Sequence, residues 1–176
     1  LVVTWHEVWG EYWQEYLGRR GVVGRAVERF VATLPDRHIA VSPSTAASLA
    51  SLGIREGVEV VPNGIDLARI AAVPPSAEAT DVIFVGRLIR EKHADLLVEA
   101  LALVREEVPD LRAVIVGDGP ERARLEGRVH DLGLTGSVTF TGFLPDYASV
   151  IAAMKASKVF VLPSTREGFG IAALEA

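Results

Sequence analysis

Short apolar runs rich in β-branched residues alternate with longer segments of helical periodicity from residue 81 onward. The runs that we expect to form strands are residues 81–86, 111–117, 137–141 and 158–162. The segments expected to be helices include residues 120–132 and 147–156. Strands and helices that alternate in this order form a parallel sheet with helices on both faces. The chain is therefore expected to belong to the α/β class.

The first helix of this region is predicted from the spacing of its apolar residues. Leu97, Leu101, Val104 and Val108 are separated by four, three and four positions, which places them on one face of a helix. We expect this face to pack against the sheet.

Residues 1–61 show the same alternation and are expected to be the end of a preceding unit of this kind. We expect strands at residues 1–4, 38–41 and 58–61, and helices at residues 24–34 and 44–52. The run from Pro62 to Asp66 is a turn signal, and residues 71–80 are rich in alanine and proline, as linkers are. The predicted organisation is a first domain in residues 1–66, a linker in 67–80 and a second domain in 81–176.

The two ends of the chain carry their own signals. The chain begins at Leu1 rather than Met, and its first residues resemble the end of a buried strand, not a signal peptide. It stops at Ala176, on the first turn of an expected helix. We therefore expect a piece of a longer protein in which both domains are incomplete.

Composition excludes several kinds of site. The chain has no cysteine, which excludes disulfides and thiolate metal sites. Its 23 acidic residues outnumber 18 lysines and arginines, and the net charge of −5 gives no general attraction to nucleic acid. No His, Asp or Glu cluster has metal-ligand spacing, so no metal is expected. No apolar stretch reaches the roughly 18 residues of a transmembrane helix. Any site for an anion must therefore be built locally.

A basic turn follows the strand expected at residues 81–86. Gly86 and Arg87 lie where this strand ends, and Lys92 lies where the next helix begins. In parallel sheets ligands bind at the carboxyl ends of strands, and a helix start adds backbone N–H donors. Arg87 and Lys92 therefore favour a diphosphate site. The alternative is a solvated surface turn that is basic without binding anything.

A glycine-rich turn follows the next strand. Gly117 and Gly119 match the start of the G-x-G-x-x-G dinucleotide fingerprint, but the third glycine would fall at Arg122. The P-loop pattern G-x-x-x-x-G-K-[ST] is absent as well. The sequence therefore favours neither NAD nor a P-loop nucleotide. We expect these glycines to form a tight turn that lets a ligand lie close to the backbone.

Two carboxylates flank a Gly-Phe-Gly turn near the end of the chain. Glu167 is followed by Gly168, Phe169 and Gly170, and Glu175 lies about one turn into the expected helix. Carboxylates accept paired hydrogen bonds from the vicinal hydroxyls of a sugar or a ribose. The alternative is that these acidic residues favour a helix N-terminus for electrostatic reasons alone.

His6 follows the first expected strand and lies among aromatic residues. It either reaches a ligand from the first domain or is a structural histidine. The aromatic residues form either a contact surface for sugar or lipid, or a packed layer between helix and sheet. They are Trp5, Trp9, Tyr12, Trp13 and Tyr16.

Taken in this order, the motifs resemble the retaining nucleotide-sugar glycosyltransferases of family 4, which have two facing Rossmann-like domains, the GT-B fold. The resemblance covers essentially the whole chain. It rests on Pro62 to Asp66, Gly86 and Arg87 with Lys92, Gly117 to Pro120, Gly142 with Phe143, and the E-x7-E signature from Glu167 to Glu175. It departs from the family at His93, where a glycine often follows the lysine.

The resemblance implies that the complete protein is a hexosyltransferase. It would move a sugar from a nucleoside diphosphate sugar to an acceptor hydroxyl, with retention at the anomeric carbon. Arg87 and Lys92 would hold the diphosphate and offset the charge on the departing nucleotide. No cofactor and no metal are implied besides the donor itself.

The resemblance also assigns roles to the sugar and ribose ends of the donor. Glu167, with the backbone N–H groups of Gly168 and Phe169, would contact the donor sugar. Glu175 would bind the ribose hydroxyls, and His6 would reach the donor sugar from the first domain. The other residues implied in donor binding are Gly86, Gly117, Gly119 and Gly170.

The implied partners are a nucleotide-sugar donor and a carbohydrate or lipid-linked acceptor. The implied location is the cytoplasm or the inner face of the membrane, with which the protein could associate peripherally. Two alternatives share the fold, namely a noncatalytic module that binds nucleotide sugars and a nucleotide-sugar epimerase or phosphorylase. An epimerase would need further acid/base residues near the anomeric carbon, and a phosphorylase would need a lysine for pyridoxal phosphate. The sequence shows neither pattern. The chain alone is expected to be inactive.

Overall fold

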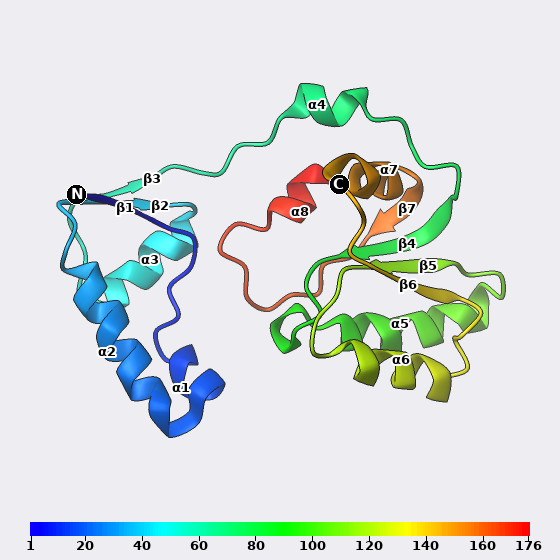
Figure 1. The fold of residues 1–176 in the computed structure, drawn as a ribbon, viewed down its shortest axis with the longest axis horizontal. Helices are drawn as coiled ribbons and strands as arrows, with labels where there is room; N and C mark the ends of the chain where they lie inside the picture. The colour runs from blue at the N-terminus through cyan, green and yellow to red at the C-terminus, as the bar shows by residue number, and fades with distance from the viewer. The chain divides into compact units, whose positions relative to one another are not determined.

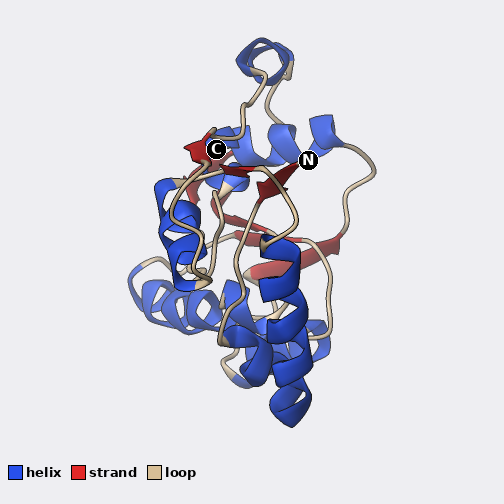
Figure 2. Cartoon of the chain, turned by 90° about the vertical axis from the view of Figure 1, so that its left-hand side faces the viewer, coloured by secondary structure: helices blue, strands red, loops and turns tan.

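Parallel strands form one sheet in each of two units in the computed structural model, which describes residues 1–176 (Figure 1). The first unit comprises Leu1–Gly64 and Glu167–Gly170, and the second comprises Ile65–Arg166 and Ile171–Ala176. Each strand is joined to the next by a segment that contains at least one helix. Figure 2 distinguishes the helices, strands and loops by colour. The predicted α/β class is therefore confirmed.

The first unit has a sheet of three parallel strands in the order β1-β2-β3. Its strands are β1 (Val2–Trp5), β2 (Arg37–Ala40) and β3 (Val58–Val60). Its helices are α1 (Tyr12–Leu17), the 3-10 turn η1 (Gly18–Arg20), α2 (Gly21–Ala32) and α3 (Pro43–Ser51). The strands and α3 agree with the prediction to within a residue at either end, whereas α2 begins three residues early and α1 was not predicted.

Aromatic rings pack against one another around α1. The ring of Trp9 contacts those of Tyr12, Trp13 and Tyr16, with centroid separations of 5.1, 4.6 and 5.3 Å. A Cβ at Gly24 would collide with the ring of Trp13, so glycine lets α1 and α2 approach closely. These rings thus pack around α1 and against α2, and Tyr16 is 62% exposed. The expected layer between helix and sheet is not what these contacts show.

A buried carboxylate ties the segment before α1 to α2. Glu28 is only 8% exposed, and its two oxygens accept hydrogen bonds from the backbone N–H groups of Trp9 at 2.7 Å and Gly10 at 2.8 Å. A buried charge is tolerated when such hydrogen bonds compensate for its lost hydration. Glu28 therefore fixes where the chain leaves β1.

The second unit has four strands in the order β6-β5-β4-β7, and all neighbours are parallel. The strands are β4 (Thr80–Val85), β5 (Ala113–Val116), β6 (Val138–Gly142) and β7 (Ser157–Phe160). The helices are α4 (Leu67–Ala72), the 3-10 turn η2 (Arg90–Lys92), α5 (Ala94–Glu107), α6 (Arg122–Asp131), α7 (Tyr147–Lys155) and α8 (Ile171–Glu175). Helices α5 and α6 cover one face of the sheet and α7 covers the other (Figure 1).

The buried face of α5 differs from the predicted one. Leu97 and Leu101 are buried as expected, but Val104 and Val108 are 41% and 42% exposed. Val98 is fully buried in their place. Because Leu97 and Val98 are both buried, the buried face of α5 is centred away from Val104, which lies at the edge of that face. Half of the predicted face was therefore wrong.

The segment predicted as a linker contains helix α4. Asp66 caps its start, because a side-chain oxygen of Asp66 accepts a hydrogen bond from the N–H of Arg69 at 2.9 Å. The ammonium group of Lys155 donates to the carbonyls of Ile70 at 2.6 Å and Val73 at 2.7 Å at the other end. Ile70 and Val73 also pack against the core of the second unit.

Backbone hydrogen bonds continue past the ends of β4 and β5 into the loops that follow. The N–H of Gly86 donates to the backbone carbonyl of Val116 at 3.0 Å. The N–H of Leu88 donates to the backbone carbonyl of Asp118 at 2.9 Å. At this separation a Cβ on Gly117 would collide with the carbonyl oxygen of Gly86, and Gly117 also has a φ of +130°. Glycine is therefore required where the two loops meet.

Glu28→Ala is expected to lower the free energy of unfolding of the first unit by about 2 kcal/mol, because two backbone N–H groups lose a charged acceptor. All three tryptophans lie in this unit, so urea unfolding followed by tryptophan fluorescence measures the effect selectively. Glu28→Gln retains one acceptor and should lose less. Equal stability of Glu28→Ala and wild type would show that the carboxylate does not anchor this segment.

Gly117→Ala is expected to destabilise the second unit by at least about 2 kcal/mol, because the methyl group strains the backbone and overlaps the Gly86 carbonyl. Urea unfolding followed by far-ultraviolet circular dichroism measures the loss. Gly127→Ala is a matched control: it lies inside α6 with open space at its Cβ, so stability should rise by about 0.5–1 kcal/mol. A Gly117→Ala variant as stable as Gly127→Ala would contradict the packing argument.

Candidate functional site

The loops that follow the four strands of the second unit emerge at one edge of its sheet, because the strands are parallel. This is the edge at which open α/β sheets bind ligands. The β4–α5 loop carries Gly86, Arg87 and Lys92, and the β5–α6 loop carries Gly117 and Gly119. The structure thus brings these five predicted residues to the same edge.

Arg87 is an exposed cation on the β4–α5 loop. Leu88, the next residue, is completely buried and anchors the loop in the core. Arg87 points outward from this anchor, and its guanidinium forms no hydrogen bond or ion pair with the chain. Arg90 differs, because it lies 3.8 Å from a carboxylate oxygen of Glu121. Arg87 is therefore available to an anionic ligand.

Lys92 is half-buried at the end of η2, and His93 follows it in a left-handed conformation with φ 47° and ψ 39°. The Nε2 atom of His93 lies 3.0 Å from the Oγ1 atom of Thr165. The loop after β7 also contacts η2 through its backbone, because the N–H of Thr165 donates to the carbonyl of Glu91 at 3.2 Å. The departure from the family at His93 thus lies at a junction between two loops.

The glycine turn after β5 is held by its own acidic residue. Asp118 accepts hydrogen bonds from the N–H of Gly119 at 2.7 Å and from the guanidinium of Arg122 at 2.9 Å. These two donors hold the pKa of Asp118 below its usual range. Arg122, which replaces the third fingerprint glycine, therefore has a structural partner. The group that approaches Gly117 and Gly119 is the backbone of the β4–α5 loop.

Glu175 lies in α8 and accepts a hydrogen bond from the phenol of Tyr147 at 2.9 Å. Burial raises the pKa of Tyr147, and its bond to Glu175 raises it further. The guanidinium of Arg69 lies over the same ring, 4.9 Å from its centroid. Tyr147 orients Glu175, and the sequence analysis did not identify it. The capping residue Asp146 predicts the start of α7 at Tyr147, but no sequence signal pairs positions 147 and 175.

The Glu167–Gly170 segment groups with the first unit, which also contains His6. Within that unit Gly168 lies against the backbone carbonyl of His6, where any Cβ would collide. The Oγ1 atom of Thr45 donates to the carbonyl of Gly168 at 3.4 Å. The structure thus brings together Gly168 and His6, two of the predicted residues. Phe169 is half-buried, and the side chains of Glu167 and His6 are exposed.

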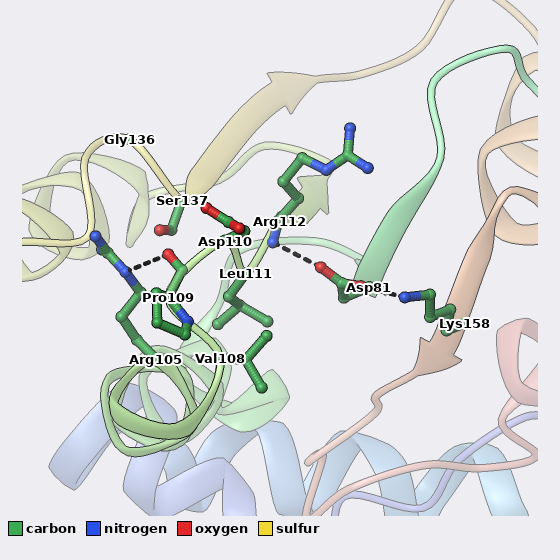
Figure 3. Close-up of a pocket in the computed structure, with 10 residues that line it drawn as sticks. All are labelled: Asp81, Arg105, Val108, Pro109, Asp110, Leu111, Arg112, Gly136, Ser137 and Lys158. Atoms are coloured by element: carbon green, nitrogen blue, oxygen red, sulfur yellow. Dashed lines mark hydrogen bonds and ion pairs between the residues drawn. The ribbon is translucent and has the colours of Figure 1, made fainter.

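A cavity of about 590 Å³ lies at the opposite, amino edge of the second sheet (Figure 3). Asp81 at its wall accepts hydrogen bonds from the Lys158 ammonium at 2.8 Å and the Arg112 N–H at 2.9 Å. These donors hold the pKa of Asp81 below its usual range. None of the predicted site residues lines this cavity. Because its carboxylate is already paired, we interpret the cluster as a tie between strands.

No group of three or more histidine, aspartate or glutamate side chains is placed to hold a metal ion. No helix combines the length and the apolar character that crossing a bilayer requires.

Comparison with known proteins assigns both parts of the chain. The family described as Glycosyl transferases group 1 matches residues 69–176, and Glycosyltransferase Family 4 matches residues 1–69. A 2-deoxystreptamine glucosyltransferase of Streptomyces kanamyceticus is 35% identical over 165 residues, which cover 86% of this chain and 42% of that protein. A GDP-mannose-dependent alpha-(1-6)-phosphatidylinositol dimannoside mannosyltransferase of Mycobacterium tuberculosis is 40% identical over 124 residues, which cover 65% of this chain and 32% of that protein. The chain thus spans less than half the length of these relatives.

Solved structures give the fold. WaaG, a glycosyltransferase involved in lipopolysaccharide biosynthesis, has a TM-score of 0.80 and 20% sequence identity with this chain. The match covers 99% of this chain and 53% of WaaG. The family matches and this similarity agree with the parallel α/β units described above, so the chain belongs to the family 4 glycosyltransferases, the glycosyl transferases group 1 proteins, and has their GT-B type of fold.

Proposed function

We propose that the protein containing this chain transfers a sugar from a nucleoside diphosphate sugar to an acceptor hydroxyl, with retention at the anomeric carbon. The observation that carries this proposal is Arg87, an exposed and unpaired cation at the carboxyl edge of a parallel sheet. Lys92, on the same loop, adds a second positive charge. A diphosphate is the leaving-group chemistry that such a cationic loop suits best.

The proposed reaction breaks the bond between the anomeric carbon and the phosphate oxygen. Negative charge then develops on the departing nucleoside diphosphate, where Arg87 and Lys92 would stabilise it. The acceptor oxygen attacks from the face that the phosphate leaves, and its proton passes to a phosphate oxygen. This route needs no protein nucleophile, and the two cations supply the charge that a divalent metal would otherwise provide.

The remaining donor contacts are assigned by chemistry and by position in the motif. Glu167 would accept hydrogen bonds from donor-sugar hydroxyls, and the N–H groups of Gly168 and Phe169 would donate to the same sugar. Glu175 would bind the ribose hydroxyls through Oε2, because Tyr147 already contacts Oε1. His6 would contact the donor sugar, and Gly170 would help to shape the turn.

The acceptor is proposed from the relatives. One relative is named for a 2-deoxystreptamine acceptor and another for phosphatidylinositol dimannoside. We therefore propose an acceptor hydroxyl on a small carbohydrate-like molecule or on a lipid-linked one. A lipid-linked acceptor would place the protein in the cytoplasm, at the inner face of the membrane.

Arg87→Ala and Lys92→Ala, made separately in the complete protein, are each expected to weaken nucleoside diphosphate binding about tenfold to a hundredfold, because each removes a charge-assisted contact. Isothermal titration with UDP, GDP and ADP measures the change, using the nucleotide that the wild type binds best. Arg112→Ala is the matched control, since it removes an exposed arginine at the opposite edge of the same sheet.

Wild-type affinity in both variants would contradict the diphosphate assignment. Binding without transfer in the wild type would instead identify a noncatalytic nucleotide-sugar module. A product with inverted anomeric configuration would contradict the retaining mechanism.

Glu167→Gln is expected to lower the transfer rate about a hundredfold while nucleotide affinity changes less than about twofold, because the amide keeps the shape but loses the charged acceptor. Initial rates with the donor and titration with the free nucleotide measure the two effects separately. An equal loss of transfer and of nucleotide binding would show that Glu167 holds the loop structure instead of the donor sugar.

A further inference from the structure

His93 is the only residue other than glycine with a positive φ in the structure. Its left-handed conformation is unfavourable for an L-residue, whereas glycine adopts it freely. Strain of this kind persists where the surrounding structure compensates for it, and it is frequent at functional sites. Contacts of the imidazole are therefore expected to offset the backbone strain at His93.

The imidazole joins two loops that are distant in the sequence. Its Nε2 atom lies 3.0 Å from Thr165 Oγ1, which is on the loop after β7. Its Nδ1 atom lies 3.8 Å from a carboxylate oxygen of Asp95, which is too long for a hydrogen bond. The contact with Thr165 is therefore the directional one. A glycine at position 93 would relieve the backbone strain but could not make it.

Two hydrogen bonds to one backbone carbonyl reinforce the same junction. The carbonyl of Glu91, inside η2, accepts hydrogen bonds from the N–H of Thr165 at 3.2 Å and from the hydroxyl of Ser164 at 3.1 Å. The side-chain contact of His93 adds a third connection within the second unit. The loop after β7 is thus held against the middle of the 3-10 turn and against the residue that follows it.

We propose that His93 is a positioning residue that couples the diphosphate loop to the loop leading into the donor-sugar residues. His93 directly follows Lys92, and Thr165 is two residues before Glu167. Its hydrogen bond to Thr165 therefore links the segments that bear these two groups. This inference rests on the proposed function for its catalytic consequence, whereas the link itself depends only on the geometry.

Amide hydrogen exchange in the complete protein tests the link directly. Thr165→Val removes the hydroxyl and leaves the backbone at position 93 unchanged, and His93→Gly removes the ring and the strain together. In both variants the amides of residues 164–166 are expected to exchange about threefold to tenfold faster, which is the effect of one lost hydrogen bond on local opening. The double variant should exchange no faster than the faster of the two single variants. Thr165→Ser retains the hydroxyl and should exchange like the wild type.

Kinetics tests the positioning role. We expect Thr165→Val to lower kcat about threefold to tenfold, with nucleoside diphosphate affinity changed less than about twofold, since only the relative placement of the loops is lost. Thr165→Ser should restore the wild-type kcat. A role confined to folding would give no such split between kcat and binding and no rescue by serine.

The outcomes separate this inference from the proposed function. Unchanged exchange at residues 164–166 in both His93→Gly and Thr165→Val would overturn the link, even in an active transferase. Equally fast exchange of residues 164–166 in Asp95→Asn would overturn it as well. The imidazole would then act through Asp95 in α5 and not through Thr165. A wild type that binds no UDP, GDP or ADP would overturn the proposed function, while the exchange experiment would still decide the link.

Discussion

The close approach of two loop backbones at the carboxyl edge of the second sheet determines the shape of the candidate site. Beyond the ends of β4 and β5, backbone hydrogen bonds continue from Gly86 to Val116 and from Leu88 to Asp118. Only glycine at position 117 leaves room for this contact. The loop is thereby rigid at Leu88, and its neighbour Arg87 extends outward from a fixed point. A ligand that binds there would meet a cation carried by a backbone that is already held in place.

The charge balance of the chain gives this cation its importance. The net charge is −5, and two other arginines near the same edge lie beside carboxylates. Arg122 pairs with Asp118 at 2.9 Å, and Arg90 lies 3.8 Å from Glu121. Arg122 is engaged by its carboxylate, whereas the contact of Arg90 is weak, because Arg90 is 87% exposed and Glu121 already pairs with Arg124 at 2.6 Å. Arg87 has no such partner, so an anion bound at this edge would meet a few local cations and not a general positive field.

The sequence predicted the strands and most helices because hydrophobic periodicity and turn residues act locally. It missed features that depend on contacts between distant segments. Helix α4 forms in a stretch read as a linker, where the distant Lys155 binds carbonyls at its end in addition to the local cap of Asp66. Val104 and Val108 have the right spacing for the buried face of α5, yet the position of the sheet selects Val98. The roles of the predicted site residues remain predictions, although their grouping by unit is observed.

The E-x7-E signature illustrates the same limit, because one continuous run of sequence is divided in the structure. Glu167 groups with the first unit and Glu175 with the second, and Gly170, with a φ of +75°, is the last residue before the chain passes from one to the other. Each carboxylate has its own support, since Tyr147 holds Glu175 and the contacts of Gly168 with His6 and Thr45 hold the segment of Glu167. The two acids are therefore constrained by different cores. The spacing in the sequence does not reveal these different supports.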